Sequence, residues 1–286
     1  MRLLMTEPSM GVWETNYPGE TAKPLPVSLG WPCMPCACQS CVAVCCQQTR
    51  QCVCLDQKTH AVISSMPAPP GVSGMLFSPC GRWLYQLSSE ADCIHTRLTA
   101  TGELLYAMPC GVFPRCMRMD ADGKRLLAAG GAAAEAYVLG APEMTVQQTV
   151  YTRHPCFAAD FWQGGLVLVC AVEGEDIHTA VYTLRSGKVR PRRLLELPGL
   201  PGTICTCPDG VHALLSTADG LMKLNLSDGT ILWNRTEWPL CMRMQCQSGL
   251  ILLSDTLSGS AALIDEQRPW QKQILFHGKN TQACFV

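Results

Sequence analysis

The 19 cysteines are the residues of this sequence with the widest range of possible chemistry. Thiols bind soft metal ions, form disulfides and carry out redox reactions. The densest stretch is CMPCACQSCVAVCC, in which Cys33 and Cys36, and also Cys38 and Cys41, have the spacing of zinc or iron–sulfur ligands. Disulfide frameworks belong to small exported domains, whereas this chain has 286 residues and an odd number of cysteines. We therefore expect free thiols that serve as small buried side chains.

A second group of cysteines follows a recurrent signal, in which a proline comes shortly before the cysteine. The signal is clear in MPC, FPRC, HPC and WPLC, and PGTIC and TQAC are looser versions. The thiols concerned belong to Cys36, Cys116, Cys156, Cys205, Cys241 and Cys284. What these thiols can reach depends on the strands that carry them.

Turn glycines that follow short apolar segments divide the chain into repeats. They are Gly81, Gly123, Gly165, Gly210 and Gly249, and successive members are 42, 42, 45 and 39 residues apart. A period near 42 is the repeat length of four-stranded propeller blades.

The stretch CMRM supports the same period, because it begins at Cys116 and again at Cys241, 125 residues or three periods later. Each repeat contains short runs of Val, Leu, Ile, Tyr and Cys between turn residues, and no run keeps a helical period. The sequence therefore predicts an all-β fold made of four-stranded antiparallel blades, with strands a to d counted from the axis outward.

Six complete repeats cover residues 32–68, 69–110, 111–151, 152–198, 199–237 and 238–278. The remaining segments, 279–286 and 1–31, look like strand a and strands b to d of a seventh blade. We expect a single domain, residues 1–286, that forms a seven-bladed β-propeller. Sharing one blade between the two ends closes the ring and removes exposed sheet edges.

The turn sequences resemble those of a known superfamily. SPCGRWLY followed by TGELLYAMP, and CPDGVHALLS followed by LNLSDGTILW, are similar to repeats of YVTN-type seven-bladed propellers, and LNLSDGTILW is also similar to quinoprotein-type repeats. The chain thus resembles the YVTN/WD40-like superfamily, which includes propellers like the β-chain of quinoprotein amine dehydrogenase. WD40 repeats in the strict sense and kelch repeats are disfavoured, since no blade ends in Trp-Asp and the Gly-Gly pairs do not recur. The resemblance implies that ligands bind at the channel mouth, which the d-to-a and b-to-c loops surround.

The proline–cysteine signal falls at the start of strand a in six blades, and Gly74 takes its place in the remaining one. A ring of axial thiols could bind soft metals or react, or it could reflect a crowded axis that accepts only small side chains. Zinc ligands must lie within about 4 Å of each other, whereas blades stack about 10 Å apart. We therefore expect the six thiols to line the channel without a metal or cofactor.

The expected mouth also carries basic and aromatic residues, which are typical anchors for ligands and partners. Arg118 and Arg243 each follow a channel cysteine by two residues and should share its face. The binding residues that we expect at the mouth are Arg115, Arg118, Arg153, His154, Trp31, Trp238, Arg243 and Lys279. The alternative is that these side chains are simply solvated.

Charge and hydropathy exclude several partners. The 22 basic and 23 acidic residues give a net charge of −1, so neither nucleic acid nor an anionic membrane is expected. No apolar run reaches the roughly 18 residues of a membrane span, and the N-terminal apolar patch is too short for a signal peptide. We expect a cytoplasmic monomer.

Three functions remain open. The first is a non-catalytic scaffold that binds a protein or small ligand at the channel mouth, and it is the one we favour. The second is a lactonase-like hydrolase, for which Glu237, Asp160 and His154 are the few available acid or base groups. The third is a thiol-based metal or redox sensor. No residue is assigned a catalytic role.

Overall fold

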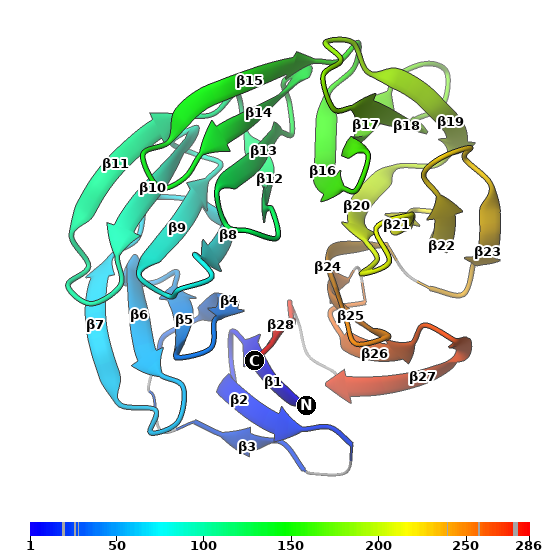
Figure 1. Cartoon of the computed structure of the whole chain (residues 1–286). Helices are drawn as coiled ribbons and strands as arrows, with labels where there is room; N and C mark the ends of the chain where they lie inside the picture. Colours follow the sequence, from blue (N-terminus) through cyan, green and yellow to red (C-terminus); the bar gives the residue numbers. More distant parts are fainter. Residues whose placement is uncertain (19–20, 26, 28, 239, 257, 277–279) are drawn as a thin grey trace.

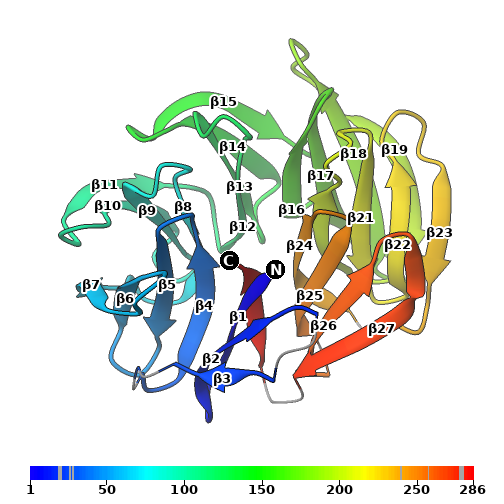
Figure 2. The ribbon, with the colours of Figure 1, turned by 60° about the horizontal axis from the view of Figure 1, so that its bottom comes forward.

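The computed structural model describes residues 1–18, 21–25, 27, 29–238, 240–256, 258–276 and 280–286. Seven four-stranded antiparallel sheets stand around a central axis (Figures 1 and 2). The described residues form strands and turns without a helix, and hence without a helix able to span a membrane. The predicted all-β fold and the number of blades are confirmed.

The blades are numbered from the first complete one, so that blade 7 contains both chain ends. The innermost strands of blades 1 to 7 are β4 (Pro32–Ala37), β8 (Val72–Phe77), β12 (Pro114–Met119), β16 (Cys156–Trp162), β20 (Pro201–Thr206), β24 (Cys241–Gln247) and β28 (Gln282–Phe285). The second strands are β5 (Cys41–Cys46), β9 (Trp83–Ser88), β13 (Arg125–Gly130), β17 (Gly165–Val172), β21 (His212–Thr217), β25 (Leu250–Thr256) and β1 (Arg2–Glu7). The third strands are β6 (Gln51–Asp56), β10 (Cys93–Leu98), β14 (Glu135–Gly140), β18 (His178–Arg185), β22 (Gly220–Asn225), β26 (Ala261–Asp265) and β2 (Gly11–Asn16). The outermost strands are β7 (Val62–Pro67), β11 (Leu104–Pro109), β15 (Thr145–Tyr151), β19 (Arg192–Pro198), β23 (Ile231–Arg235), β27 (Arg268–Phe276) and β3 (Lys23–Pro24).

The ring closes as the sequence predicts, with the two ends of the chain in one sheet. β28 pairs antiparallel with β1, so that Leu3 lies opposite Phe285 and Thr6 opposite Gln282. The Gln282 side chain also accepts a 2.5 Å hydrogen bond from the backbone N–H of Met34, which ties blade 7 to blade 1. Both termini lie near the axis (Figures 1 and 2).

The hydrophobic core lies between the faces of adjacent blades. The second strands are buried on both faces, and β17 is the longest example. Cysteines contribute much of this core, because 15 of the 19 are buried and all 19 are free thiols. A thiol occupies little volume and needs no strong hydrogen bond, which suits it to narrow gaps between sheets.

The turns that define the sequence repeat have a common structure. Asp120 accepts hydrogen bonds from the backbone N–H groups of Lys124 and Arg125, both at 2.9 Å. Asp209 does the same for Val211 and His212 in blade 5. The glycine between donor and acceptor, such as Gly123 with φ of 71°, occupies a left-handed conformation that other residues disfavour.

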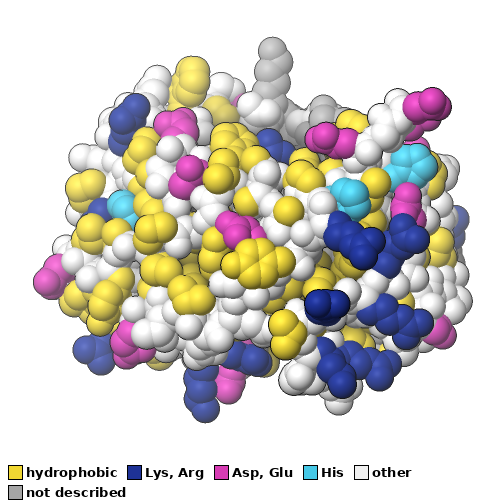
Figure 3. All heavy atoms as spheres, turned by 90° about the horizontal axis from the view of Figure 1, so that it is seen from above, with side chains coloured by type: hydrophobic (Ala, Val, Ile, Leu, Met, Phe, Trp, Pro, Cys, Tyr) yellow, Lys and Arg dark blue, Asp and Glu magenta, His cyan; other side chains and the backbone are white. Residues whose placement is uncertain are grey.

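The outer surface is uneven in charge. Five basic residues are exposed in and beside the β18–β19 turn, namely Arg185, Lys188, Arg190, Arg192 and Arg193. Figure 3 shows the largest group of Lys and Arg side chains on the β19 side, whereas hydrophobic side chains are spread over the β11 and β15 side. This basic group lies on the outside of blade 4, away from the axis.

Candidate functional site

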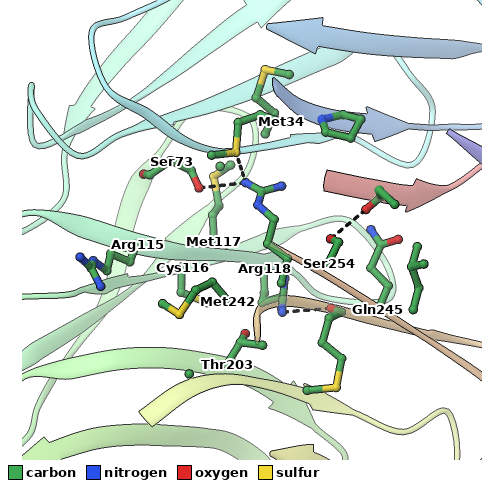
Figure 4. A pocket seen from close by; sticks show the side chains of 18 of the residues that line it. Met34, Ser73, Arg115, Cys116, Met117, Arg118, Thr203, Met242, Gln245 and Ser254 are labelled. Atoms are coloured by element: carbon green, nitrogen blue, oxygen red, sulfur yellow. Dashed lines mark hydrogen bonds between the residues drawn. The ribbon is translucent and has the colours of Figure 1, made fainter. Parts of the chain in front are cut away.

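A cavity of about 310 Å³ lies in the central channel (Figure 4). Its walls come mainly from the first residues of the inner strands, including Arg115 and Arg118 of β12 and Arg243 of β24. Because these strands begin at the d-to-a connectors, the cavity belongs to the mouth end of the channel. Polar side chains in the wall include Ser73, Thr203, Gln245 and Ser254, and apolar ones include Met34, Met75, Met117, Met242 and Met244.

Arg118 spans the channel from blade 3. Its Nη2 atom donates hydrogen bonds to the backbone oxygens of Ile204, at 3.2 Å, and Met244, at 3.5 Å. Burial lowers the pKa of Arg118, but the thiols of Cys116 and Cys205 and the Asp160 carboxylate more than offset it, so the pKa is raised. The guanidinium therefore stays charged inside the channel.

Asp160, from the neighbouring blade 4, partly balances that charge. Its Oδ2 atom lies 3.9 Å from Arg118 Nε and accepts hydrogen bonds from the backbone N–H and the hydroxyl of Thr206. Burial raises the pKa of the Asp160 carboxyl, and Arg118 and Thr206 lower it in part. Asp160 is 7% exposed and does not line the cavity, so it supports Arg118 from behind.

Arg243 enters the cavity from blade 6. Its Nη2 atom donates a 3.0 Å hydrogen bond to the backbone oxygen of Ser73 and contacts the sulfur of Met34 (Figure 4). These contacts reach blades 1 and 2, so Arg118 and Arg243 cross the channel from different sides and are held by backbone atoms on other blades.

The two arginines lie at different depths. Arg118 pairs with Leu127, the third residue of its neighbouring strand, whereas Arg243 pairs with Ser254, the fifth. Two residues correspond to about 7 Å along a strand. The two CMRM stretches therefore occupy the same strand of their blades, as predicted, but with a two-residue offset in register.

The same register places the six predicted channel thiols at several depths rather than in one ring. Cys36, Cys205 and Cys284 pair with the third residue of the next strand, Cys116 with the fifth, and Cys156 and Cys241 nearer the connector. Register shifts inside five inner strands, β4, β8, β12, β16 and β20, explain the difference, since a bulge adds a residue that counting from the proline cannot reveal. Among the six, Cys116 lines the cavity, and the other five are buried around it.

One layer of the channel is strongly polar. The residues that pair with the third position of each second strand are, from blade 1 to blade 7, Cys36, Leu76, Arg118, Asp160, Cys205, Gln245 and Cys284. Arg118 and Asp160 are neighbours in this layer. Burial raises the pKa of Cys205 and that of Cys284 to about 12, so both remain protonated thiols at neutral pH.

The residues expected at the rim are divided by the structure. Arg115 lines the cavity, and its guanidinium stacks on Phe113 and Phe157, with 5.2 and 5.6 Å to the ring centroids. Trp31 is 54% exposed in the connector before β4. Arg153 is exposed and His154 half-buried in the connector between β15 and β16, outside the cavity wall.

Trp238 differs from the expectation of a rim residue, because it is 3% exposed and packs with Cys205, Cys241 and Met244 between blades 5 and 6. An indole in a connector buries more apolar area between two sheets than at a rim. Lys279 lies outside the described residues.

The sequence did not single out the methionines and hydroxyl residues of the wall. Met117, Met242 and Met244 flank the two arginines in the CMRM stretches, so their alternation with arginine was an available signal.

The dense cysteine stretch does not assemble into a metal knuckle. Cys41, Cys45 and Cys46 lie on β5, and Cys33 pairs with Cys45 across the sheet. In the described part of the chain, one group of three residues brings metal-ligand atoms within 4.8 Å of each other, and it consists of Cys207, Cys246 and Glu266. None of these three lines the cavity.

No family model matches the sequence, and no curated protein does. Solved structures are similar in fold. A protein from Lactobacillus plantarum is 11% identical with a TM-score of 0.76, and 99% of each chain is covered. The periplasmic gluconolactonase PpgL of Pseudomonas aeruginosa is 15% identical with a TM-score of 0.70, covering 100% of this chain and 98% of that one. Kuenenia stuttgartiensis hydrazine synthase is 14% identical with a TM-score of 0.68, covering 85% of this chain and 79% of that one.

At such identities the likeness shows the fold alone. The class of protein is therefore a seven-bladed β-propeller. Its structural neighbours are consistent with the quinoprotein- and YVTN-like superfamily that the turn sequences resemble.

Proposed function

We propose that this propeller binds a small anionic molecule in its channel cavity and that it acts by binding rather than by catalysis. The observation that carries the proposal is the arrangement of Arg118 and Arg243, which reach into one cavity from different blades. The cavity volume of about 310 Å³ lies within the range of small-molecule sites, roughly 300–1,000 Å³.

The chemistry of the wall defines the ligand class. A guanidinium offers a planar fork of donors that suits carboxylate and phosphate groups. Backbone oxygens already hold the Nη2 atoms of Arg118 and Arg243, so little side-chain order is lost when an anion binds. The methionine side chains supply an adaptable apolar surface for the rest of the ligand.

Lactone hydrolysis is the alternative that the fold leaves open, and the likeness to PpgL supports it as much as it supports binding. Hydrolysis needs a positioned acid or base in contact with the ligand. The described cavity wall contains arginines but neither a histidine nor a carboxylate, which favours binding.

The test is calorimetric titration of the full chain with gluconate, citrate and inorganic phosphate, and with uncharged glucono-lactone for comparison. At least one anion is expected to bind saturably. Arg243→Met should weaken that binding by tenfold or more, or about 1.4 kcal/mol. Arg118→Lys keeps the charge beside Asp160 and should weaken binding through the lost fork geometry.

Arg185→Met is the matched control, because Arg185 is exposed on the outside of blade 4 and should leave binding unchanged. The proposal fails if no anion binds, or if Arg185→Met weakens binding as much as Arg243→Met. Turnover of glucono-lactone that depends on Arg243 would instead support the hydrolase.

A protein partner at the mouth is the second candidate. Large apolar side chains are exposed on the mouth-side loops, among them Trp31 at 54%, Val112 at 56% and Phe113 at 42%. A partner captured from native lysate by the wild-type chain and lost from both Trp31→Ser and Phe113→Ser would favour this function. A partner retained by both variants would count against it.

A further inference from the structure

A cluster of thiols and a carboxylate joins blades 5 and 6 at the end of the ring opposite to the channel mouth. Cys207 directly follows β20, Cys246 lies near the end of β24, and Glu266 directly follows β26. All three therefore sit beside the a-to-b and c-to-d turns. Backbone hydrogen bonds fix two of them, since Cys207 N–H donates to His212 and Glu266 N–H donates to Gly249.

The spacing of the ligand atoms fits a tetrahedral ion. The Cys207 and Cys246 sulfurs and a Glu266 oxygen lie within 4.8 Å of one another, and Cys246 Sγ is 4.0 Å from Glu266 Oε2. Zn–S bonds of about 2.3 Å and Zn–O bonds of about 2.1 Å place tetrahedral ligands about 3.6 Å apart. A shift of a few tenths of an ångström would complete the geometry.

Lys223 acts as an outer partner of the carboxylate. Its Nζ atom lies 2.5 Å from Glu266 Oε1, which leaves Oε2 directed toward the thiols. Lys223 and Glu266 side chains are each 15% exposed, so the orientation is held in a largely dry environment. Hydrogen-bonded outer partners of this kind are a regular feature of metal sites.

The charges also balance. Two thiolates and the Glu266 carboxylate carry three negative charges, which Lys223 and a divalent cation would neutralise together. The hydrogen bond between the two thiols raises the pKa of Cys207 and lowers the pKa of Cys246, so the pair readily holds one thiolate. Metal binding would release the remaining proton.

We propose that Cys207, Cys246 and Glu266 form a zinc site that fastens blade 5 to blade 6. Calcium and magnesium prefer sites made only of oxygen ligands, whereas zinc combines thiolates with a carboxylate. Cys207 is 4% exposed, while Cys246 and Glu266 are half-buried, which leaves room for water at the fourth position. The site is separate from the cavity proposed to bind anions.

The test uses the full chain, reduced with a phosphine and stripped with a chelator, and then titrated with Zn²⁺ or Co²⁺. One equivalent of Zn²⁺ is expected, and Co²⁺ should give thiolate charge-transfer absorption and tetrahedral visible bands. Saturating Zn²⁺ should raise Tm by about 5 °C when it reaches a hundredfold excess over Kd.

Cys246→Ser and Glu266→Gln should each weaken Zn²⁺ binding more than tenfold, and Cys246→Ser should also reduce the charge-transfer band. Lys223→Met should weaken binding without changing the stoichiometry. Cys80→Ser is the control, because Cys80 is an exposed thiol outside the cluster. Circular dichroism of the metal-free variants checks that each one folds.

The proposal is overturned if the wild-type chain binds no Zn²⁺ at micromolar concentrations, or if Cys80→Ser loses as much affinity as Cys246→Ser. Arg243→Met should keep full Zn²⁺ binding, so a failure of the anion site and a failure of the zinc site are distinguishable.

Discussion

Arg243 Nη2 lies 3.0 Å from the backbone oxygen of Ser73, although the two residues are 170 positions apart. The bond passes in front of blades 7 and 1 and links blade 6 to blade 2. An arginine that reaches across a channel in this way narrows it and at the same time orients a charge in its interior. The inner strands therefore have to be close and regular, and four predictions concern what keeps them so or what the turns contribute.

Gly202 on β20 should not tolerate a side chain, whereas Gly74 on β8 should. A Cβ at Gly202 would lie 2.5 Å from the Cys241 backbone oxygen and 2.6 Å from Leu240 Cδ1. At Gly74 the nearest atom would be Leu87 Cβ at an ordinary 3.5 Å. We expect Gly202→Ala to cost about 1–3 kcal/mol and Gly74→Ala less than about 1 kcal/mol in urea unfolding. Equal losses in the two variants would contradict the close approach of β20 to blade 6.

Asp120 should stabilise its turn far more than Asp122, two residues later. Asp120 is 7% exposed and binds two backbone N–H groups and the Arg125 guanidinium, whereas the Asp122 side chain is 60% exposed. Asp120→Ala leaves those donors without their acceptor, which should cost about 1–3 kcal/mol. Asp122→Ala should stay within about 0.5 kcal/mol of the wild type. Matching midpoints of thermal or urea unfolding for the two variants would refute this assignment.

Asp209 should make stability fall in acid. Burial raises the pKa of its carboxyl, but hydrogen bonds from His212 and from backbone N–H groups outweigh burial and lower the pKa to about 2. The folded-state pKa lies below the unfolded value of about 3.9, so the stabilisation is complete above about pH 4 and is lost as the pH falls toward 2. The side chain is 43% exposed, and solvent screening limits the effect to about 1 kcal/mol.

The measurement compares the wild type with Asp209→Asn in urea at several pH values. The asparagine can still accept the backbone hydrogen bonds but does not titrate, so the stability difference between the two proteins should shrink as the pH is lowered. A difference that is the same at about pH 5 and about pH 2.5 would show that Asp209 does not contribute through its charge.

Cys80 should be the first cysteine to react with iodoacetamide. It is the exposed one of the 19, and hydrogen bonds from the Ser78 hydroxyl and the backbone of Arg82 lower the pKa of its thiol. A larger thiolate fraction at about pH 7 gives faster alkylation. Peptide mapping by mass spectrometry should find Cys80 labelled in the fast phase, and Cys80→Ser should remove that phase. Earlier labelling of another cysteine in the native protein would disprove the prediction.

The sequence predicts the blades because their turns are local. Gly81, Gly123 and Gly210 mark sharp bends at a regular interval, and the aspartates beside them close the bends through their own backbone neighbours. The closure of the ring is also predictable, because the segments left over at the two ends complete one blade.

Depth along the channel could not be predicted in the same way. Each bulge near the start of an inner strand shifts the following residues, so Cys116 and Cys36 lie at different levels although both follow a proline. Burial of Trp238 and convergence of Cys207, Cys246 and Glu266 depend on how blades 5 and 6 stack. Such contacts between repeats leave no periodic trace in either repeat.

The seam between β1 and β28 has a consequence for the order of assembly. Six sheets form from neighbouring residues, but the seventh requires the two extremes of the chain to meet, which costs on the order of 5 kcal/mol in loop entropy. That sheet should therefore be the last to assemble and the first to open. A circular permutant that joins Val286 to Met1 and begins at the loop before another blade would move this weak point without altering a single strand pair, since Val286 N–H already bonds to Arg2.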